Sequence, residues 1–246
     1  MLRVLTVLAL LLPLPGLGAD RPACDLPPEL LHPEPLPAAA AAIAHGHLHI
    51  LAIGSASVLG AGGTSPAAAW PERLRAVIAA RRPNLDVTVE VRGGRGLSAT
   101  DQRHLLNLAL GNGRIDLVIW QAGATEAVRG LPVDGLTDVL TPALQQLRAR
   151  DVDAIVMDLQ FSRFLRANAD VEPYREALRI AAAAAGVPLF PRYELMNHWA
   201  DADSVDVERA ARDARPAEVD RLNGCIADAL AAFIREGVRE ARRPPP

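Results

Sequence analysis

Three histidines at alternate positions are the first residues in this sequence that could bind a ligand. In a strand, His45, His47 and His49 would place their imidazoles on one side, where they could hold a metal ion. The beginning of a strand explains the same spacing without a ligand, so we predict no metal site. The aspartates within residues 201–206 are spaced too irregularly for a calcium loop, and the glycines within residues 93–96 lack the spacing of a dinucleotide motif. We therefore predict no cofactor.

The two cysteines, Cys24 and Cys225, are the next candidates for chemistry. An even pair in an oxidising compartment favours one disulfide, and the alternative is two free thiols, one exposed and one buried.

Residues 1–19 combine one arginine, an apolar run and small residues, which is typical of a secretory signal peptide too short to anchor the chain in a membrane. We therefore predict a periplasmic or secreted protein with a Pro/Ala-rich segment at residues 20–46.

The composition excludes several other classes of protein. Hydrophobic residues make up 50% of the 246 residues and charged residues 22%, which favours a folded core over disorder. The formal net charge of −3 does not fit a nucleic-acid-binding protein, which needs a strongly basic face. The length suits one α/β domain, and we find no internal repeat.

Strand-like and helix-like segments alternate along the chain. The predicted strands are residues 47–53, 86–91, 115–120, 152–157 and 187–190, and the predicted helices are residues 66–82, 98–110, 136–150, 171–185 and 217–239. This alternation predicts a three-layer α/β/α domain over residues 47–240, with a central five-stranded parallel sheet of the flavodoxin-like type. Residues 241–246 end in prolines and are predicted to form a disordered tail. Functional loops would lie at the carboxyl ends of the strands.

The loops that follow the strands resemble those of the SGNH (GDSL-type) ester hydrolases, in particular a secreted bacterial branch. The similar segments are ILAIGSASVLGAG, VEVRGGRG, LVIWQAGATEAVRG, VMDLQF and a final helix that carries a cysteine. The resemblance implies the SGNH-hydrolase fold and a serine-triad mechanism. In that mechanism a serine attacks the acyl carbon, a glycine and an asparagine stabilise the oxyanion, and a C-terminal Asp-x-x-His supplies the base.

The residues at the signature positions depart from that pattern. The positions that match the nucleophile, the glycine, the oxyanion asparagine and the base are Ala56, Gly96, Thr125 and Ala217, with Asp213 or Ala214 at the acidic position. Gly96 is chosen over Gly93 and Gly94. No histidine follows His198, which we interpret as a helix-face or surface residue. The resemblance therefore implies the fold of a hydrolase without its usual catalytic side chains.

Two serines beside Ala56 leave an alternative open. A shift of the loop could present Ser55 or Ser57 as a relocated nucleophile, although both also suit a turn or a helix cap. Polar residues at the strand ends could line the cleft or hydrogen-bond the loops, and these are Gln121, Glu126, Arg129, Asp158 and Gln160.

Our leading hypothesis is an exported, catalytically inactive protein whose cleft binds an acylated or carbohydrate ligand. The alternative is an active acyl or carbohydrate esterase with a relocated serine, and a third possibility is an interaction protein of the envelope or its polysaccharides.

Overall fold

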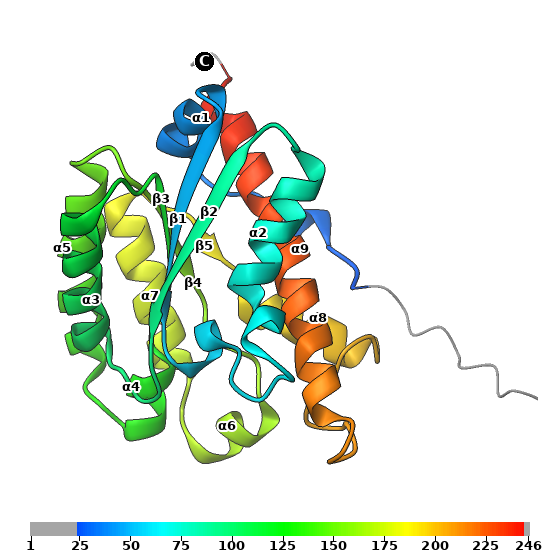
Figure 1. Ribbon diagram of the computed structural model, residues 1–246. Helices are drawn as coiled ribbons and strands as arrows, with labels where there is room; N and C mark the ends of the chain where they lie inside the picture. Colours follow the sequence, from blue (N-terminus) through cyan, green and yellow to red (C-terminus); the bar gives the residue numbers. More distant parts are fainter. Residues whose placement is uncertain (1–23, 244–246) are drawn as a thin grey trace, which may run out of the picture.

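The computed structural model describes residues 24–243, and its centre is a parallel sheet of five strands (Figure 1). The strands are β1 (His47–Gly54), β2 (Asp86–Gly93), β3 (Leu117–Gln121), β4 (Asp153–Met157) and β5 (Leu189–Phe190). Their order across the sheet is β2-β1-β3-β4-β5, and every neighbouring pair is parallel. The predicted five-stranded parallel sheet is thus confirmed. The predicted signal peptide and residues 244–246 lie outside the described residues.

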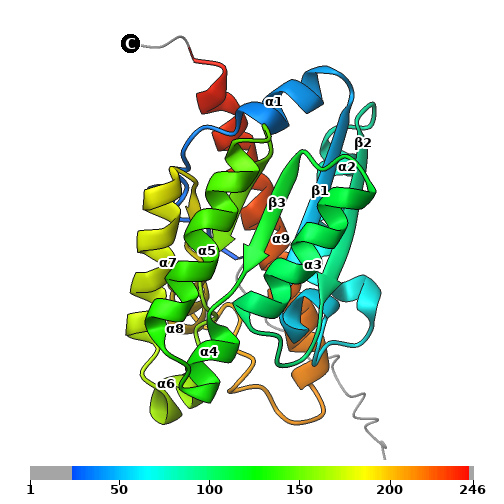
Figure 2. The same cartoon turned by 90° about the vertical axis from the view of Figure 1, so that its left-hand side faces the viewer.

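Helices cover both faces of the sheet. One face carries α1 (Pro37–Ala44), α2 (Trp70–Arg81), α8 (Arg192–Asp201) and α9 (Arg215–Ala241), and the other carries α3 (Ala99–Asn112), α5 (Val133–Arg148) and α7 (Glu172–Ala185). Figure 2 shows α3, α5 and α7 in front of the sheet with α9 behind it. All of β3 is buried, with Leu117 and Ile119 in one core and Val118 and Trp120 in the other. This explains why the sequence of β3 is almost continuously apolar.

Several predicted boundaries were wrong, mostly for reasons of proline chemistry. The helix expected at 66–82 is divided into a 3₁₀ turn, η3 (Pro66–Ala68), and α2, because Ala69 is extended. A proline occupies the first turn of each of these helices, where its missing N–H costs nothing. The fifth strand is shorter than 187–190, since Pro188 has no N–H to donate to the sheet.

The N-terminal segment is part of the domain and does not lie outside it. Helix α1 packs on β1 and α9, and the Leu36 N–H donates to Gly237 O at 3.0 Å. The Asp153 carboxylate accepts from the Ala39 N–H at 2.8 Å, and burial raises the pKa of Asp153 to about 6. At the other end, α9 extends to Ala241, one residue into the predicted tail.

A disulfide joins Cys24 to Cys225, as the sequence predicts. Cys225 is buried on α9. Asp25, the residue after Cys24, accepts a hydrogen bond from the Trp199 indole through its backbone oxygen at 2.6 Å. The start of the described chain is therefore held against α8 and α9. Within residues 24–243 no helix combines the length and apolarity needed to cross a membrane.

Replacing both cysteines by serine should lower the free energy of unfolding. The bond spans 201 residues, for which the chain-entropy model gives about 5 kcal/mol as an upper value. Urea unfolding of the wild type and of the Cys24→Ser/Cys225→Ser protein, each with and without reductant, measures the loss. Reductant should destabilise only the wild type, and equal sensitivity of both proteins would contradict the assignment.

Candidate functional site

The loops with the family resemblance all follow carboxyl ends of strands and gather at one end of the sheet. In Figure 1 this is the lower end, where α4 (Ala124–Arg129) and α6 (Arg163–Asn168) lie. Neither short helix was predicted, since each is only six residues long and has little periodicity. Each lies in one of the loops that follow the strands, so they form the border of the candidate site.

Two glycines bring the ends of β1 and β2 close together. A Cβ on Gly93 would lie 2.7 Å from Gly54 O and 2.5 Å from the Val58 side chain, and one on Gly54 would lie 3.0 Å from Gln121. No side chain fits at position 54 or 93, because these distances are shorter than normal contacts between non-bonded atoms. The loop that holds residues 55–57 is therefore packed tightly between β2 and β3.

The two candidate serines are held by the side-chain amide of Gln121. Ser57 Oγ donates to Gln121 Oε1 at 2.8 Å, and Gln121 Nε2 approaches Ser55 Oγ at 3.5 Å. Gln121 is 2% exposed, and the methyl of Ala56 lies between the two serines in the chain. An amide cannot accept a proton in the way that an imidazole does, so this contact orients the hydroxyls without activating them.

The histidines of the chain lie away from these serines. All six are in residues 24–243, and none of them hydrogen-bonds to Ser55 or Ser57. His198 is on α8 with Nε2 3.5 Å from the Asp25 carboxylate, near the disulfide. His47 and His49 lie at the beginning of β1, at the opposite end of the strand from the serines. Seven residues of strand separate the ends of β1, which is about 23 Å.

A buried glutamate connects the loop after β3 to the loop after β2. Glu126 is 4% exposed and accepts a hydrogen bond from the Ala99 N–H at 2.5 Å, which links α4 to the first turn of α3. Thr125, at the position of the family's asparagine, is buried in the first turn of α4. Gly96 is exposed at a turn with φ +72°, a conformation that favours glycine. In the alignment that the resemblance implies, the buried hydroxyl of Thr125 occupies the position of the family's asparagine amide.

Ser98 caps α3 as predicted. Its hydroxyl accepts from the Asp101 N–H, and Asp101 accepts from the Ser98 N–H at 2.9 Å, which forms a capping box. The Asp101 carboxylate also accepts from the Ser98 hydroxyl at 2.7 Å, and this bond, together with that from the Ser98 N–H, lowers the pKa of Asp101. The loop that contains Gly96 therefore enters α3 in a fixed direction.

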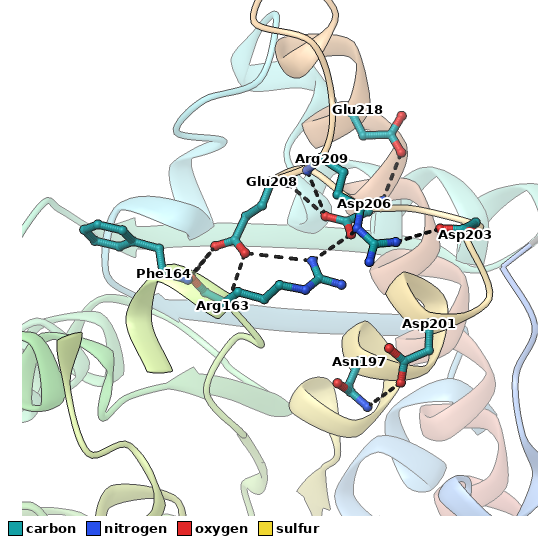
Figure 3. A network of polar contacts seen from close by, with 10 residues as sticks. Arg163, Phe164, Asn197, Asp201, Asp203, Asp206, Glu208, Arg209 and Glu218 are labelled. Atoms are coloured by element: carbon teal, nitrogen blue, oxygen red, sulfur yellow. Dashed lines mark hydrogen bonds and ion pairs between the residues drawn. The ribbon is translucent and has the colours of Figure 1, made fainter. Parts of the chain in front are cut away.

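The loop before α9 makes structural ion pairs at residues 203–209, upstream of the positions assigned to the Asp-x-x-His (Figure 3). Arg163 Nη1 lies 2.7 Å from the Asp206 carboxylate, and Glu208 accepts from the Arg163 N–H at 2.8 Å and from the Phe164 N–H at 3.2 Å. Arg209 pairs with Asp203 at 3.0 Å. These contacts fasten the loop to the beginning of α6.

The positions assigned to the base and its carboxylate lie beyond these ion pairs. Ala217 is an exposed residue in the first turn of α9, and Asp213 and Ala214 just before the helix are exposed as well. The sequence could not reveal the link to α6, because its partners are more than 40 residues apart.

The polar residues predicted at the strand ends have different surroundings. Gln121 and Glu126 make the hydrogen bonds described above, while Arg129 is exposed and Gln160 is half-buried.

Asp158 is completely buried after β4, and its Oδ2 accepts hydrogen bonds from Arg175 Nε at 3.0 Å and Nη2 at 2.8 Å. Burial raises the pKa of Asp158, and the hydrogen bonds and charge of Arg175 oppose this shift.

A polar groove that the sequence did not indicate lies between α6, α7 and α8. Its volume is about 790 Å³, and its lining includes Arg166, Asn168, Glu172, Tyr193 and Asn197. The Arg175 guanidinium lies 3.8 Å from the centre of the Tyr193 ring. A signal was available in RYELMNHWAD, where Tyr193 and Asn197 are four residues apart on one face of a helix.

A second cluster of chemically capable residues lies at the other end of the sheet. His47, His49 and Asp116 each offer a ligand atom, and these atoms lie within 4.8 Å of one another. The sequence pattern had drawn attention to the histidines. It missed Asp116, which follows them by 67 residues and comes close only because β3 pairs with β1.

Truncating Arg175 should destabilise the protein strongly. Arg175→Ala leaves the Asp158 carboxylate buried without its partner, for which we expect a loss of about 3–5 kcal/mol in the free energy of unfolding. Arg179→Ala is the matched control on the same helix, because its exposed pairs with Glu172 and Glu176 contribute less than about 1 kcal/mol. Urea unfolding measures both variants, and equal losses would contradict the importance of the buried pair.

The sheet order, the flanking helices and the position of these loops define an SGNH/GDSL-type hydrolase fold. The chain belongs to the non-GDSL lipase-like family, whose sequence model matches residues 23–240. A comparison with curated proteins gives no match. The family match includes most of the N-terminal segment, in agreement with its packing on α9.

Solved esterases and lipases share this fold at low sequence identity. A catalytic mutant of Axe2, an acetylxylan esterase from Geobacillus stearothermophilus, has a TM-score of 0.60 and 14% identity over 77% of this chain and 94% of its own. The lipase/acylhydrolase from Enterococcus faecalis has a TM-score of 0.57 and 18% identity, over 75% of this chain and 95% of its own. The psychrotrophic esterase EstA from a Pseudoalteromonas species has a TM-score of 0.55 and 16% identity, over 74% of this chain and 98% of its own. At these identities the similarity concerns the fold.

Proposed function

We propose that this chain is an exported, catalytically inactive member of the SGNH-hydrolase fold, which uses the loop end of the sheet to bind an acylated or carbohydrate ligand. Export is supported by the pattern of residues 1–19 and by the disulfide between Cys24 and Cys225. A periplasmic or secreted location follows from this proposal.

The observation that carries the proposed inactivity is the contact between Ser57 and Gln121. The hydroxyl of Ser57, one of the two serines next to the family's nucleophile position, donates to a buried amide oxygen at 2.8 Å, and Ala56 has no hydroxyl. Loss of a triad nucleophile or base costs about 10⁶ in rate where it has been measured, and loss of an oxyanion donor costs roughly 10²–10³. Loss of the nucleophile or the base alone would reduce ester hydrolysis to a negligible rate.

The groove beside α6 and α8 is the proposed binding surface. Its asparagine, acidic and arginine side chains provide donors and acceptors for hydroxyl groups, and Tyr193 provides an aromatic ring. Sites for small molecules commonly combine such polar groups with an aromatic surface. Because α6 and α8 follow β4 and β5, this groove lies at the same end of the sheet as residues 55–57.

Restoring the hydroxyl alone should not restore esterase activity. We expect neither the wild type nor Ala56→Ser to hydrolyse p-nitrophenyl acetate above background or to react with a fluorophosphonate probe, because no imidazole is available as a base. Initial rates and intact-mass spectrometry measure the two reactions. Ser57→Ala is the control for any residual activity.

Two results would support the active esterase instead. One is a covalent fluorophosphonate adduct on Ser55 or Ser57 of the wild type. The other is reaction of the Ala56→Ser protein, which would show that a base lies within reach of position 56.

Acetylated xylan is the first polysaccharide to test for binding in the groove, because the structurally similar Axe2 is an acetylxylan esterase. We expect retardation of the wild type in affinity electrophoresis with acetylated xylan, and at least a fivefold weaker effect for Asn197→Ala or Tyr193→Ala. Asn107→Ala, on the exposed surface of α3, is the matched control. Equal binding by all variants would exclude the groove, and a matched titration with deacetylated xylan shows whether the acetyl groups are recognised.

A further inference from the structure

Two imidazoles and one carboxylate meet at the amino-terminal end of the sheet, away from the proposed ligand groove. His47 and His49 are two residues apart on β1, so their side chains share one face of the sheet, and their ring centres are 5.4 Å apart. Asp116 immediately precedes β3, the neighbour of β1. His47 Nε2 lies 3.9 Å from Asp116 Oδ2.

The Asp116 carboxylate is held in place by the strand pairing. It is 3% exposed, and its Oδ2 accepts from the His49 N–H at 2.8 Å while its Oδ1 accepts from Arg114 Nε at 2.8 Å. The Asp116 N–H in turn donates to His49 O at 2.9 Å. The position of this carboxylate relative to the histidines therefore depends on the backbone and not on a flexible side chain.

One ring nitrogen in the cluster has no hydrogen-bond partner. His47 Nε2 is buried from solvent, and no described residue hydrogen-bonds to it. Buried polar atoms are nearly always satisfied, and an unsatisfied one costs about 1–3 kcal/mol. A cation bound between His47 and Asp116 would satisfy this nitrogen.

The second imidazole is oriented by a hydroxyl. His49 Nδ1 lies 2.7 Å from Thr88 Oγ1 on β2. Imidazoles that bind metals usually make such a hydrogen bond through the other ring nitrogen, which sets the orientation and tautomer of the ring. The arrangement leaves Nε2 of His49 as its free donor atom.

We propose that His47, His49 and Asp116 form a binding site for a divalent transition-metal ion of the zinc and copper class. Two imidazoles and a carboxylate suit these ions, whereas Mg²⁺ and Ca²⁺ prefer oxygen ligands alone. The ligand atoms now lie within 4.8 Å of one another, so binding of one ion requires rotation of the imidazoles to bring them closer. Water, or His45 with its ring centre 6.3 Å from that of His47, would complete the coordination.

A metal ion at this place would join β1 to β3 at the end of the sheet opposite residues 55–57. The site is therefore independent of the proposed ligand binding, and its expected effect is on stability. Protons compete with metal ions for the imidazole nitrogens, so affinity should be lower at acidic pH.

Calorimetric titration of Zn²⁺ into the tag-free, metal-free protein tests the proposal. At pH 7.5 we expect one site per chain with a dissociation constant in the micromolar range or below, and at least tenfold weaker binding at pH 5.5. His47→Gln and His49→Gln should each weaken binding at least tenfold. His104→Gln is the control, because His104 is exposed on α3. Cu²⁺ should bind more tightly than Zn²⁺, and Mg²⁺ should not bind.

Thermal unfolding provides a second measurement on the same proteins. Zn²⁺ should raise the melting temperature of the wild type and of His104→Gln, but not that of His47→Gln or His49→Gln. If the wild type shows no one-to-one binding of Zn²⁺ or Cu²⁺ below about 100 μM, or if both cluster variants bind like the wild type, the proposal is wrong. Circular dichroism confirms that each variant is folded, and either of the two cluster variants is sufficient for the test.

Discussion

The parallel pairing of β1 with β3 controls the chemistry at both ends of the molecule. Ile50 is level with Leu117 and Ile53 with Trp120, so this one register brings Gln121 next to residues 55–57 at the carboxyl end. At the amino end it brings Asp116 next to His49. Because side chains alternate along a strand, a shift of one residue would turn every one of these groups to the opposite face. The register is secure because β3 is buried on both faces.

The carboxyl end of the sheet has the framework of the SGNH/GDSL-type hydrolase fold. Gly54 and Gly93 still allow β1 and β2 to approach closely, and Glu126 still connects the second loop to the third. In the loop before α9, Asp206 and Glu208 bind Arg163 and the beginning of α6. Ion pairs of this kind hold a loop in one conformation, which suits a surface that binds and does not need a mobile base.

Much of the fold was predictable, since it depends on patterns within short segments. The alternation of apolar strands with helices predicted all five strands and their parallel direction, and Ser98 was correctly identified as a helix cap. The errors occurred where prolines interrupt a pattern, as in residues 66–70, and where helices of six residues have too little periodicity to be seen. The apolar residues of α1 pack against α9, a contact that no pattern within the segment before residue 47 specifies.

The sequence by itself determined which groups are missing, because a methyl at position 56 and the lack of any histidine after His198 are properties of the residues alone. The tertiary structure alone decided what surrounds the groups that remain. The amide beside Ser57, the arginine beneath Tyr193 and the carboxylate beside His47 come from positions 18 to 69 residues away along the chain. Contacts at such separations depend on strand register and helix packing, which no local pattern of residue types specifies.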